Sequence, residues 1–346
     1  MFYLLTNHRA TAYTLCMDNL LKRLTEKKKK LDGFRPLSSA LVDNLNEWLK
    51  VELTYTSNAI EGNTLTRRET ALVVEQGITV RGKTLKEHLE AINHAEALDF
   101  IKELVRRKRK DLTKREVLDI HVLILKKIDD ENAGRYRNIA VRIRGAHVIL
   151  PNPLKVPELM EGFFAWLHSK NNEHPAKIAA DAHIKLVSIH PFADGNGRTA
   201  RLLMNLLLMQ KGYPPALIRK EDRDVYVDSI EKAQLSSAFE DYYKVMYRAI
   251  ERSLDIYLDA VEGKAPNAVV QKRLLKIGEL AKETGETLHT IRHWTEKGLL
   301  EVAEHTEAGY QLYDRSMVER IKEIRKLQKE DRLSIDEIKR KLGGLL

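Results

Sequence analysis

The sequence predicts a mainly α-helical protein, with a helical bundle that carries a short β-hairpin and, after it, a small winged helix-turn-helix domain. Apolar residues recur at helical spacing through most of residues 10–260. A short stretch near residue 145 alternates instead, and a helix, a glycine turn and a second helix follow a linker near residue 265. We therefore expect an N-terminal helical region 1–110, a core 111–261, a linker 262–273 and a C-terminal domain 274–346.

Composition narrows the class of protein. The chain has 346 residues, of which 43% are hydrophobic and 32% charged, as in soluble globular proteins of two or three domains. No apolar run approaches the ~20 residues of a membrane span, and residues 1–15 lack the apolar core of a secretion signal. Cys16 is the single cysteine, so we expect a cytoplasmic protein without an internal disulfide or a membrane partner. The net charge of +9 suits an anionic partner without identifying it.

Two helices are expected before Gly62. The first covers residues 10–31, and the second begins at Ser38 and runs through Glu61, with Gly62 as a natural terminator. A carboxylate at a helix C-terminus opposes the helix dipole. Glu61 should therefore have a cationic partner, and an arginine is the obvious one.

The middle of the chain should continue as helices and then change pattern. Further helices are expected over residues 65–110, and Thr113 and Glu116 form a capping box for the next one. The helical pattern breaks at Gly134. Residues 141–150 alternate around a glycine, which predicts a short hairpin.

The densest cluster of functional side chains is the stretch 189–201, Ile-His-Pro-Phe-Ala-Asp-Gly-Asn-Gly-Arg-Thr-Ala-Arg. A helical pattern opened by Pro175 precedes it and an apolar run closed by Gly212 follows it, so the stretch is a helix–loop–helix corner. Glycines at the mouth of a helix leave backbone N–H groups free for an anion, and arginines suit phosphate oxygens. The candidate anion-binding residues are Gly195, Asn196, Gly197, Arg198 and Arg201.

His190 and Asp194 supply the chemistry that an anion site lacks. A histidine can take a proton from a hydroxyl near neutral pH. An aspartate is a hard oxygen ligand, which fits Mg²⁺ held mainly by nucleotide phosphates and water. Base, metal ligand and polyphosphate cradle together indicate phosphoryl or nucleotidyl transfer, and the alternative is a polar loop whose His and Asp only cap helices.

This stretch resembles the signature of Fic-domain proteins, His-Pro-Phe-x-Asp/Glu-Gly-Asn-Gly-Arg-x-x-Arg, at every specified position. The resemblance, which covers about residues 1–260, implies transfer of AMP from ATP to a Ser, Thr or Tyr hydroxyl of a target protein, with release of pyrophosphate. It implies that His190 is the base and Asp194 the Mg²⁺ ligand, with the five anion-binding residues around the triphosphate. A kinase-like branch of the family lacks the second glycine, so Gly197 favours nucleotidyl transfer over phosphorylation.

The stretch Ser57-x-x-x-Glu61-Gly62 resembles the inhibitory motif found beside many Fic domains. The resemblance implies that Glu61 pairs with Arg201 and obstructs the terminal phosphate of the nucleotide, so that the chain inhibits itself. In some relatives the same glutamate serves to hydrolyse AMP from the modified target. Removal of AMP is therefore an alternative activity.

The predicted hairpin resembles the flap that lines the active site of Fic proteins and binds the target segment by strand pairing. The flap residues are Arg144, Gly145, Ala146, His147, Val148 and Ile149. The resemblance places adenine and ribose near the helix after Arg223, where Tyr226 can stack or hydrogen-bond and Gln234 can contact a base edge. Relatives often have a second tyrosine and an asparagine where Val227 and Gln234 stand here, and Tyr226 as an ordinary core residue is an equal expectation.

Residues 277–300 have the pattern of a helix-turn-helix, and with 309–313 and the later helices they resemble a MerR-like winged DNA-binding domain. The candidate DNA contacts are Arg292, His293 and Lys297. Glu304 and Gln311 stand where such wings usually have arginines, and residues 272–346 hold 16 Lys and Arg against 14 Asp and Glu, a net charge of +2. Phosphate neutralisation dominates DNA affinity, so a monomer should bind DNA weakly.

Two alternatives stay open for this C-terminal domain and for the chain. The domain can dock a protein or form a homodimer instead of binding DNA. The whole chain can also be a DNA-binding regulator whose Fic domain senses nucleotide rather than a transferase.

Overall fold

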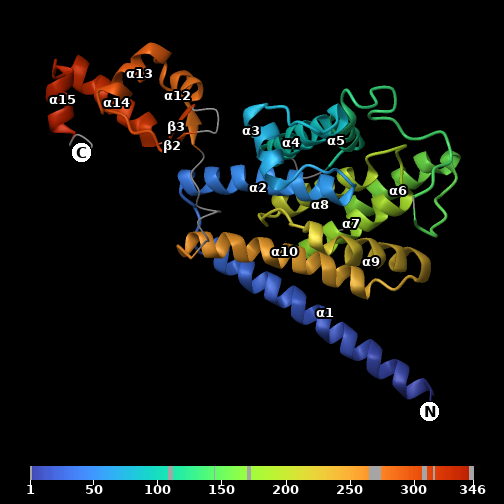
Figure 1. Ribbon diagram of the computed structural model, residues 1–346. Helices are drawn as coiled ribbons and strands as arrows, with labels where there is room; N and C mark the ends of the chain where they lie inside the picture. The colour runs from blue at the N-terminus through green and yellow to red at the C-terminus, as the bar shows by residue number, and fades with distance from the viewer. Residues whose placement is uncertain are drawn as a thin grey trace. The chain divides into compact units, whose positions relative to one another are not determined.

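A computed structural model describes residues 2–107, 112–143, 145–169, 173–264, 274–305, 310–314 and 316–342. The chain divides into two compact units, Met1–Ala265 and Pro266–Leu346. The predicted mainly α-helical class is confirmed (Figure 1). The regions predicted as 1–110 and 111–261 share one compact unit and one core, and the predicted linker lies outside the described residues from 265 onward. In the described part of the chain, no helix has the length and apolar character needed to cross a membrane.

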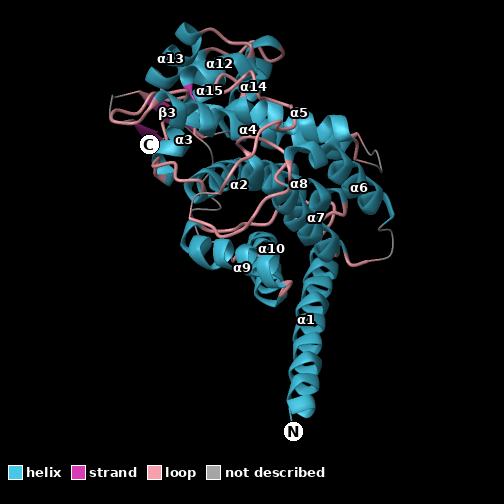
Figure 2. Cartoon of the chain, turned by 90° about the vertical axis from the view of Figure 1, so that its right-hand side faces the viewer, coloured by secondary structure: helices cyan, strands magenta, loops and turns pink. Residues whose placement is uncertain are grey.

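The first unit is a bundle of helices around two central ones, α7 and α8. Its α-helices are α1 (Phe2–Asp32), α2 (Ser39–Ile60), α3 (Arg67–Gln76), α4 (Leu85–Arg106), α5 (Lys114–Leu125), α6 (Val156–Ser169), α7 (Pro175–Ile189), α8 (Asn196–Gln210), α9 (Arg223–Ser236) and α10 (Glu240–Val261). Two 3₁₀ turns, η1 (Pro153–Lys155) and η2 (Lys220–Asp222), join them. α7 packs along α8, α1 packs along α10, and α4 contacts α2, α5 and α8 (Figures 1 and 2).

Local capping explains where several helices begin. The capping box predicted at Thr113 is present at the start of α5, where its hydroxyl accepts from the Glu116 N–H at 3.3 Å and the Glu116 carboxylate accepts from the Thr113 N–H at 2.7 Å. α3 and α4 begin with the same arrangement. The second predicted helix is α2, which ends at its C-cap Glu61, and Gly62 follows with φ +98°.

The central corner forms as the sequence predicts. Pro175 opens α7, and the helix ends because His190 adopts the left-handed conformation with φ 49° and ψ 60°. α8 begins after Gly195, which is also left-handed with φ 77°. Residues 190–195, six in all, therefore connect two buried helices.

The structure differs from the sequence at the predicted hairpin. Residues 141–143 and 145–150 contain no strand, and one turn bond joins the Ala146 N–H to the Ile143 carbonyl at 3.3 Å. Arg144 lies outside the described residues. A two-stranded hairpin is marginal in water on its own, and the carbonyls at its base are bound by Arg137 rather than by a partner strand. The flap is consequently a loop.

The second unit is the predicted winged helix-turn-helix. Its elements are β1 (Leu275–Lys276), α12 (Ile277–Thr284), α13 (Leu288–Glu296), β2 (Glu304–His305), β3 (Gln311–Tyr313), α14 (Ser316–Lys329) and α15 (Ile335–Lys341). The antiparallel sheet has the order β1-β3-β2. Trp294, Tyr313 and Ile321 belong to a core of its own, and Gly285 makes the turn between α12 and α13 with φ 71°.

Candidate active site

His190 stands on the corner in the form of a neutral base. Its Nδ1 lies 3.3 Å from the Val187 carbonyl oxygen, which can only accept, so Nδ1 carries the proton and Nε2 keeps its lone pair. Burial lowers the pKa of His190 below its usual 6.5, against smaller opposing effects of Val187, Glu61 and Asp194. The imidazole is therefore unprotonated at neutral pH.

Asn196 closes the loop rather than pointing a free amide at an anion. Its Oδ1 accepts from the Phe192 N–H at 3.0 Å and its Nδ2 donates to the Phe192 carbonyl at 2.9 Å. The side chain is buried. The neutral side-chain donor expected from the sequence is thus occupied within the loop itself.

His121 and Arg137 support the loop, and sequence reasoning missed both. His121 Nδ1 accepts from the Gly134 N–H at 2.9 Å, so its Nε2 donates to the Asp194 carbonyl at 2.9 Å, and its ring stacks on Phe192 with centroids 3.7 Å apart. Burial lowers the pKa of His121 to about 4, which keeps this tautomer neutral. Neither residue belongs to a local pattern that marks it as part of the site.

Arg137 ties the corner to the flap. Its Nε donates to the His190 carbonyl at 2.7 Å, and its other nitrogens donate to the carbonyls of Ile139 at 3.0 Å and Pro151 at 2.7 Å. Its backbone N–H donates to the Pro191 carbonyl at 2.8 Å. One buried guanidinium therefore fixes the backbone at His190 and at both ends of the flap loop.

The ion pair expected between Glu61 and Arg201 is present. Arg201 Nη2 lies 2.7 Å from Glu61 Oε1, and Ser57 accepts from the same guanidinium through its hydroxyl at 3.0 Å and its carbonyl at 2.9 Å. The Arg201 side chain is buried, whereas 37% of the Glu61 side chain is exposed. The expected pair is thus formed, and Ser57, one turn before Glu61 on α2, adds two contacts to Arg201 that were not expected.

Glu61 fills space at the mouth of α8. A methyl group built on Gly197 would overlap the Glu61 carboxylate and lie 3.1 Å from Arg201 Nη1. The cradle beside Gly197 is therefore occupied by the glutamate in this state. An anion that uses the same N–H groups has to displace it.

Arg198 is buried with unused hydrogen-bonding capacity. Its Nη1 lies 3.3 Å from Glu90 Oε1 and its Nη2 lies 3.7 Å from Asp194 Oδ1, but its Nε and Nη1 have no aligned acceptor among the described residues. Buried donors without acceptors cost free energy. A phosphate oxygen at this position would supply the hydrogen-bond acceptor that Nε and Nη1 of Arg198 lack.

Tyr226 does not face a ligand site in this structure. Only 2% of it is exposed, so the prediction of a stacking face for the nucleotide does not fit this state, and the core alternative does. Gln234 lies on the partly exposed side of α9, where its Nε2 donates to the Ser188 hydroxyl at 3.2 Å. Of Tyr226 and Gln234, Gln234 is therefore the residue that stays accessible to solvent.

The Tyr226 hydroxyl instead continues a directed chain of hydrogen bonds from Arg201. Tyr242 donates to the Ala180 carbonyl at 2.6 Å, so His183 Nδ1 must donate to Tyr242 and His183 Nε2 must accept from Tyr226 at 2.8 Å. Burial lowers the pKa of His183 to about 3, in line with this neutral tautomer. Arg201 Nη1 then approaches the Tyr226 oxygen at 3.4 Å.

Replacing Tyr226 by phenylalanine should lower the free energy of unfolding by about 1–3 kcal/mol, because it leaves the buried His183 Nε2 without a donor. Chemical denaturation of both proteins measures this. Tyr136→Phe is the matched control: its hydroxyl is buried without a partner in the described residues, so its removal should be neutral or stabilising. Equal effects of the two variants would contradict the hydrogen-bond chain.

The flap loop is bound to α9 at His147. Its backbone N–H donates to Glu231 Oε1 at 2.8 Å, and its ring Nδ1 lies 3.0 Å from the same oxygen. Ile149 is 94% exposed. Glu231 is a further residue that sequence reasoning missed, and it occupies the backbone N–H group of His147.

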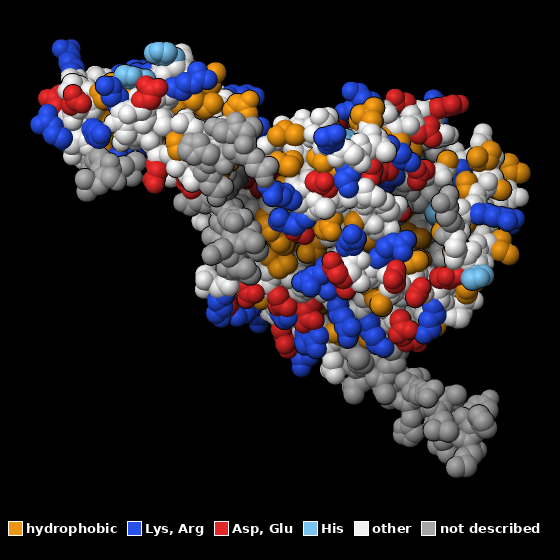
Figure 3. Space-filling view, in the orientation of Figure 1, with side chains coloured by type: hydrophobic (Ala, Val, Ile, Leu, Met, Phe, Trp, Pro, Cys, Tyr) orange, Lys and Arg blue, Asp and Glu red, His pale blue; other side chains and the backbone are white. Residues whose placement is uncertain are grey.

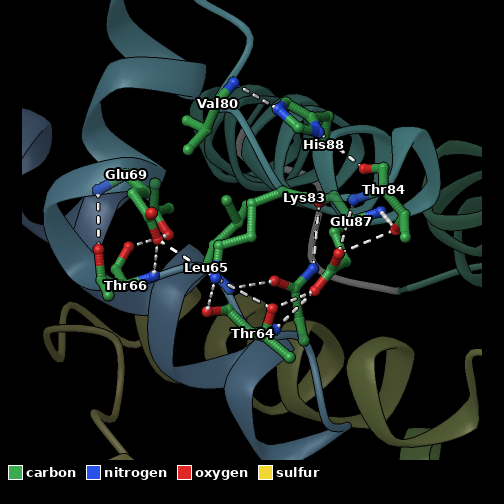
Figure 4. Close-up of polar contacts among 11 residues, drawn as sticks. Thr64, Leu65, Thr66, Glu69, Val80, Lys83, Thr84, Glu87 and His88 are labelled. Carbon is green, nitrogen blue, oxygen red and sulfur yellow. Dashed lines mark hydrogen bonds and ion pairs between the residues drawn. The ribbon is translucent and has the colours of Figure 1, made fainter.

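The chain after Glu61 is anchored to α4 by a cluster around Glu87. Thr64 donates to Glu87 Oε1 through its N–H and hydroxyl at 2.9 and 2.6 Å, Thr84 donates to Oε2 at 2.8 and 2.9 Å, and Lys83 donates to the Thr64 carbonyl at 2.7 Å (Figure 4). Asn63 donates to Glu90 Oε2 at 2.8 Å, and Glu90 faces Arg198. The end of α2 is thus fixed where it meets the corner.

Replacing Glu87 by glutamine should lower the free energy of unfolding by about 1–3 kcal/mol at pH 7, because an amide nitrogen cannot accept the Thr donors. Thr64 and Thr84 lower the pKa of Glu87 from 4.5 to about 2. The carboxylate's contribution is therefore complete above pH 4.5 and fades as pH falls toward 2, where the two proteins should converge. Denaturation at pH 7 and pH 2.5 measures this, with the exposed Glu131→Gln as control. A difference that does not shrink in acid would refute it.

Asp194 is the one predicted metal ligand, and 55% of its side chain is exposed at the edge of the corner. Its Oδ1 accepts from the Gly195 N–H at 2.6 Å. In the described parts of the chain, no three His, Cys, Asp or Glu side chains gather as a metal site.

The corner between α7 and α8 places this chain among helical proteins in which a glycine-flanked helix mouth follows a half-buried histidine. The profile of the Fic/DOC family matches residues 111–208, and that of the MerR HTH family regulatory proteins matches residues 275–345. The solved structure of Fic-1 from C. elegans superimposes with a TM-score of 0.69 and 29% identity over 76% of this chain and 78% of that one. A variant of the same protein superimposes with a TM-score of 0.66 and 31% identity over 74% of this chain and 76% of that one. The chain belongs to the Fic/DOC family.

Two similar sequences share the same name. The chain is 37% identical to "Protein adenylyltransferase Fic" of Nematostella vectensis over 69% of this chain and 56% of the relative. It is 38% identical to the protein of the same name from Aedes aegypti over 68% of this chain and 47% of the relative. The chain thus spans about half the length of the curated relatives it matches.

Proposed function

We propose that this chain is a protein adenylyltransferase, which transfers AMP from ATP to a Ser, Thr or Tyr hydroxyl of a target protein and is held inactive by Glu61. The observation that carries the proposal is the corner itself, where a neutral imidazole stands beside a helix mouth with two buried arginines. The name shared by the relatives points to the same reaction.

The residues of the corner divide the reaction among them. His190 Nε2 takes the proton of the target hydroxyl, whose oxygen attacks the α-phosphorus of ATP. The bond from that phosphorus to the bridging oxygen breaks, and pyrophosphate leaves with the bond's electrons. Arg198 and Arg201, with the N–H group at Gly197, neutralise the charge on the phosphates. The product is the target's phosphodiester of AMP.

Mg²⁺ fits this site through Asp194. A single exposed carboxylate beside a polyphosphate cradle matches the way Mg²⁺ is bound in nucleotide sites, by one or two carboxylates with phosphates and water. The ion would supply charge neutralisation on the phosphates. Asp194 would hold it, while the flap residues Gly145 to Ile149 would hold the target.

Incubation with ATP labelled at the α-phosphate, Mg²⁺ and a lysate as source of target should label protein, whereas ATP labelled at the γ-phosphate should not. The pair of labels separates AMP transfer from phosphorylation. Labelling by the γ-phosphate alone would overturn the proposal. Mass spectrometry of the labelled protein then identifies the hydroxyl.

Removal of AMP from a modified target is a second activity of the same site. The observation that favours it is the Glu61 carboxylate, which is partly exposed at the helix mouth and can orient water there. This activity needs Glu61, so Glu61→Gly should lose it while gaining transfer. Purified AMP-modified target serves as substrate for the comparison.

A DNA-binding role is proposed for the second unit because it is a winged helix-turn-helix with its own core. Arg292 and Lys297 are exposed on and beside α13, and His293 is half-buried. Fragment 274–346 should bind duplex DNA weakly, with affinity that falls steeply with salt. Arg292→Ala should weaken binding at least about threefold, whereas Lys329→Ala on α14 should not; fluorescence anisotropy measures both. Salt-independent binding would instead favour protein docking.

Two further expectations belong to this proposal. A homodimer through the second unit would strengthen DNA binding by joining two weak sites, and light scattering measures the mass. We place the protein in the cytoplasm because its single cysteine, Cys16, suits a reducing compartment.

A further inference from the structure

A cavity of about 300 Å³ lies in the first unit, away from the corner residues described above. It is lined by the N-terminal half of α2, by α4, by the end of α8 with the residues that follow it, and by Tyr257 of α10. Nothing in the proposed reaction uses it. Its volume is at the lower end for small-molecule sites.

The floor of this cavity is apolar. Leu49 and Leu53 of α2 and Leu98 of α4 are buried beneath it, and Met209 and Pro214 add to the wall. Figure 3 shows apolar side chains between α2 and α10 with Lys and Arg side chains beside them. Such a floor favours a ligand with an apolar body over bound water.

The charged residues on the wall of the cavity are all basic. Arg35, Lys50 and Lys102 line it, and no Asp or Glu does. Arg35 donates to the Gly212 carbonyl at 2.8 Å, and Lys50 pairs with Asp99. Both of these cations are therefore already engaged.

Lys102 differs from its neighbours because its ammonium has no hydrogen bond or ion pair among the described residues. It is half-buried, and burial lowers its pKa, opposed by the field of Asp99. Asn46 and Tyr257 also line the cavity, and burial raises the pKa of the Tyr257 hydroxyl to about 12, so both add polar groups that are neutral at pH 7. One free cation with two neutral polar groups matches a single negative charge, as on a carboxylate, better than a phosphate dianion.

We propose that this cavity binds a small organic carboxylate with an apolar body and that its occupancy braces α2 in the inhibited position. Four residues of α2 besides Leu53 line the cavity, namely Val42, Asn46, Leu49 and Lys50. The cavity is formed while Glu61 is paired with Arg201, so a ligand that fits it better in this arrangement than with α2 displaced stabilises the pair. The claim that the ligand braces α2 rests on the proposed function. The claim that the cavity binds a carboxylate does not.

Binding is tested on the full chain with octanoate as the probe and octanamide as its neutral counterpart. Octanoate should raise the melting temperature in a dose-dependent way, and octanamide should bind at least about tenfold more weakly. Lys102→Met should lose at least about tenfold in octanoate affinity, and Val105→Trp, which fills the cavity, should abolish binding. Lys86→Met, an exposed position at the start of α4, should bind as the wild type does.

These measurements decide whether the cavity binds a carboxylate. Removing an unpaired, half-buried charge should not unfold the protein, so Lys102→Met remains measurable. Equal binding of octanoate and octanamide, no binding to the wild type, or unchanged binding in Lys102→Met would overturn the assignment.

Bracing is tested in the AMP-transfer assay. Octanoate should lower labelling by the wild type severalfold but leave Lys102→Met unchanged, and its effect should disappear in Glu61→Gly. Octanoate binding without an effect on labelling would refute the bracing. A protein that never labels a target, even as Glu61→Gly, would refute the proposed function and leave the binding result standing.

Discussion

Replacing His190 by alanine is expected to lower AMP transfer by about 10²–10⁴-fold, the usual contribution of a general base. The reason is the free lone pair on Nε2, which the Val187 carbonyl leaves available by engaging Nδ1. The phosphates are assigned to Arg198 and Arg201, so ATP binding should change little. Labelling from α-phosphate-labelled ATP measures transfer, and calorimetric titration with ATP measures binding.

The control for this variant is His289→Ala, which removes an exposed imidazole from the second unit. Because a base must be unprotonated, wild-type transfer should be lost as pH falls through the pKa of His190, which burial holds below 6.5. Transfer within tenfold of the wild type by a folded His190→Ala protein would remove the histidine from the mechanism.

Replacing Glu61 by glycine is expected to raise AMP transfer by about 10–100-fold. The carboxylate overlaps the space beside Gly197 and makes a charge-assisted bond to Arg201, which is worth about 1.5–3 kcal/mol. Each 1.4 kcal/mol corresponds to a factor of ten in the competition between nucleotide and glutamate. The α-phosphate label, compared at equal protein and ATP concentrations, gives the ratio directly.

Two variants separate the causes of this activation. Glu61→Gln keeps the bulk and loses the charge, so it should be activated less than Glu61→Gly if obstruction matters as well as pairing. Arg201 keeps its two bonds to Ser57 in both, so the fold should persist. Wild-type labelling by a folded Glu61→Gly protein, with Glu131→Gly as the neutral comparison, would argue against inhibition by this residue.

Local features were accessible from the sequence because their partners lie within a turn or two. A capping box joins residues three apart, as at Thr113 and Glu116, and a proline or glycine marks a helix end by its own backbone preference. The corner at 189–201 is such a case, since its glycines and its helices are all specified nearby. The prediction of a hairpin at 141–150 was wrong because strand pairing there is not decided locally. It depends on which groups bind the carbonyls at its base, and Arg137 binds them.

The sequence by itself determined the helical class, the course of the corner and the chemistry that residues 190–201 can perform, because these follow from short-range patterns. The tertiary structure decided which side chains stay available to do it. Packing buries Tyr226 and directs its hydroxyl to His183. The Asn196 amide bonds to Phe192 within the loop, and Arg137 binds the carbonyl of His190. It also joins Glu61 to Arg201 across 140 residues of chain. Contacts of that kind depend on how whole helices pack, and no spacing within one helix encodes them.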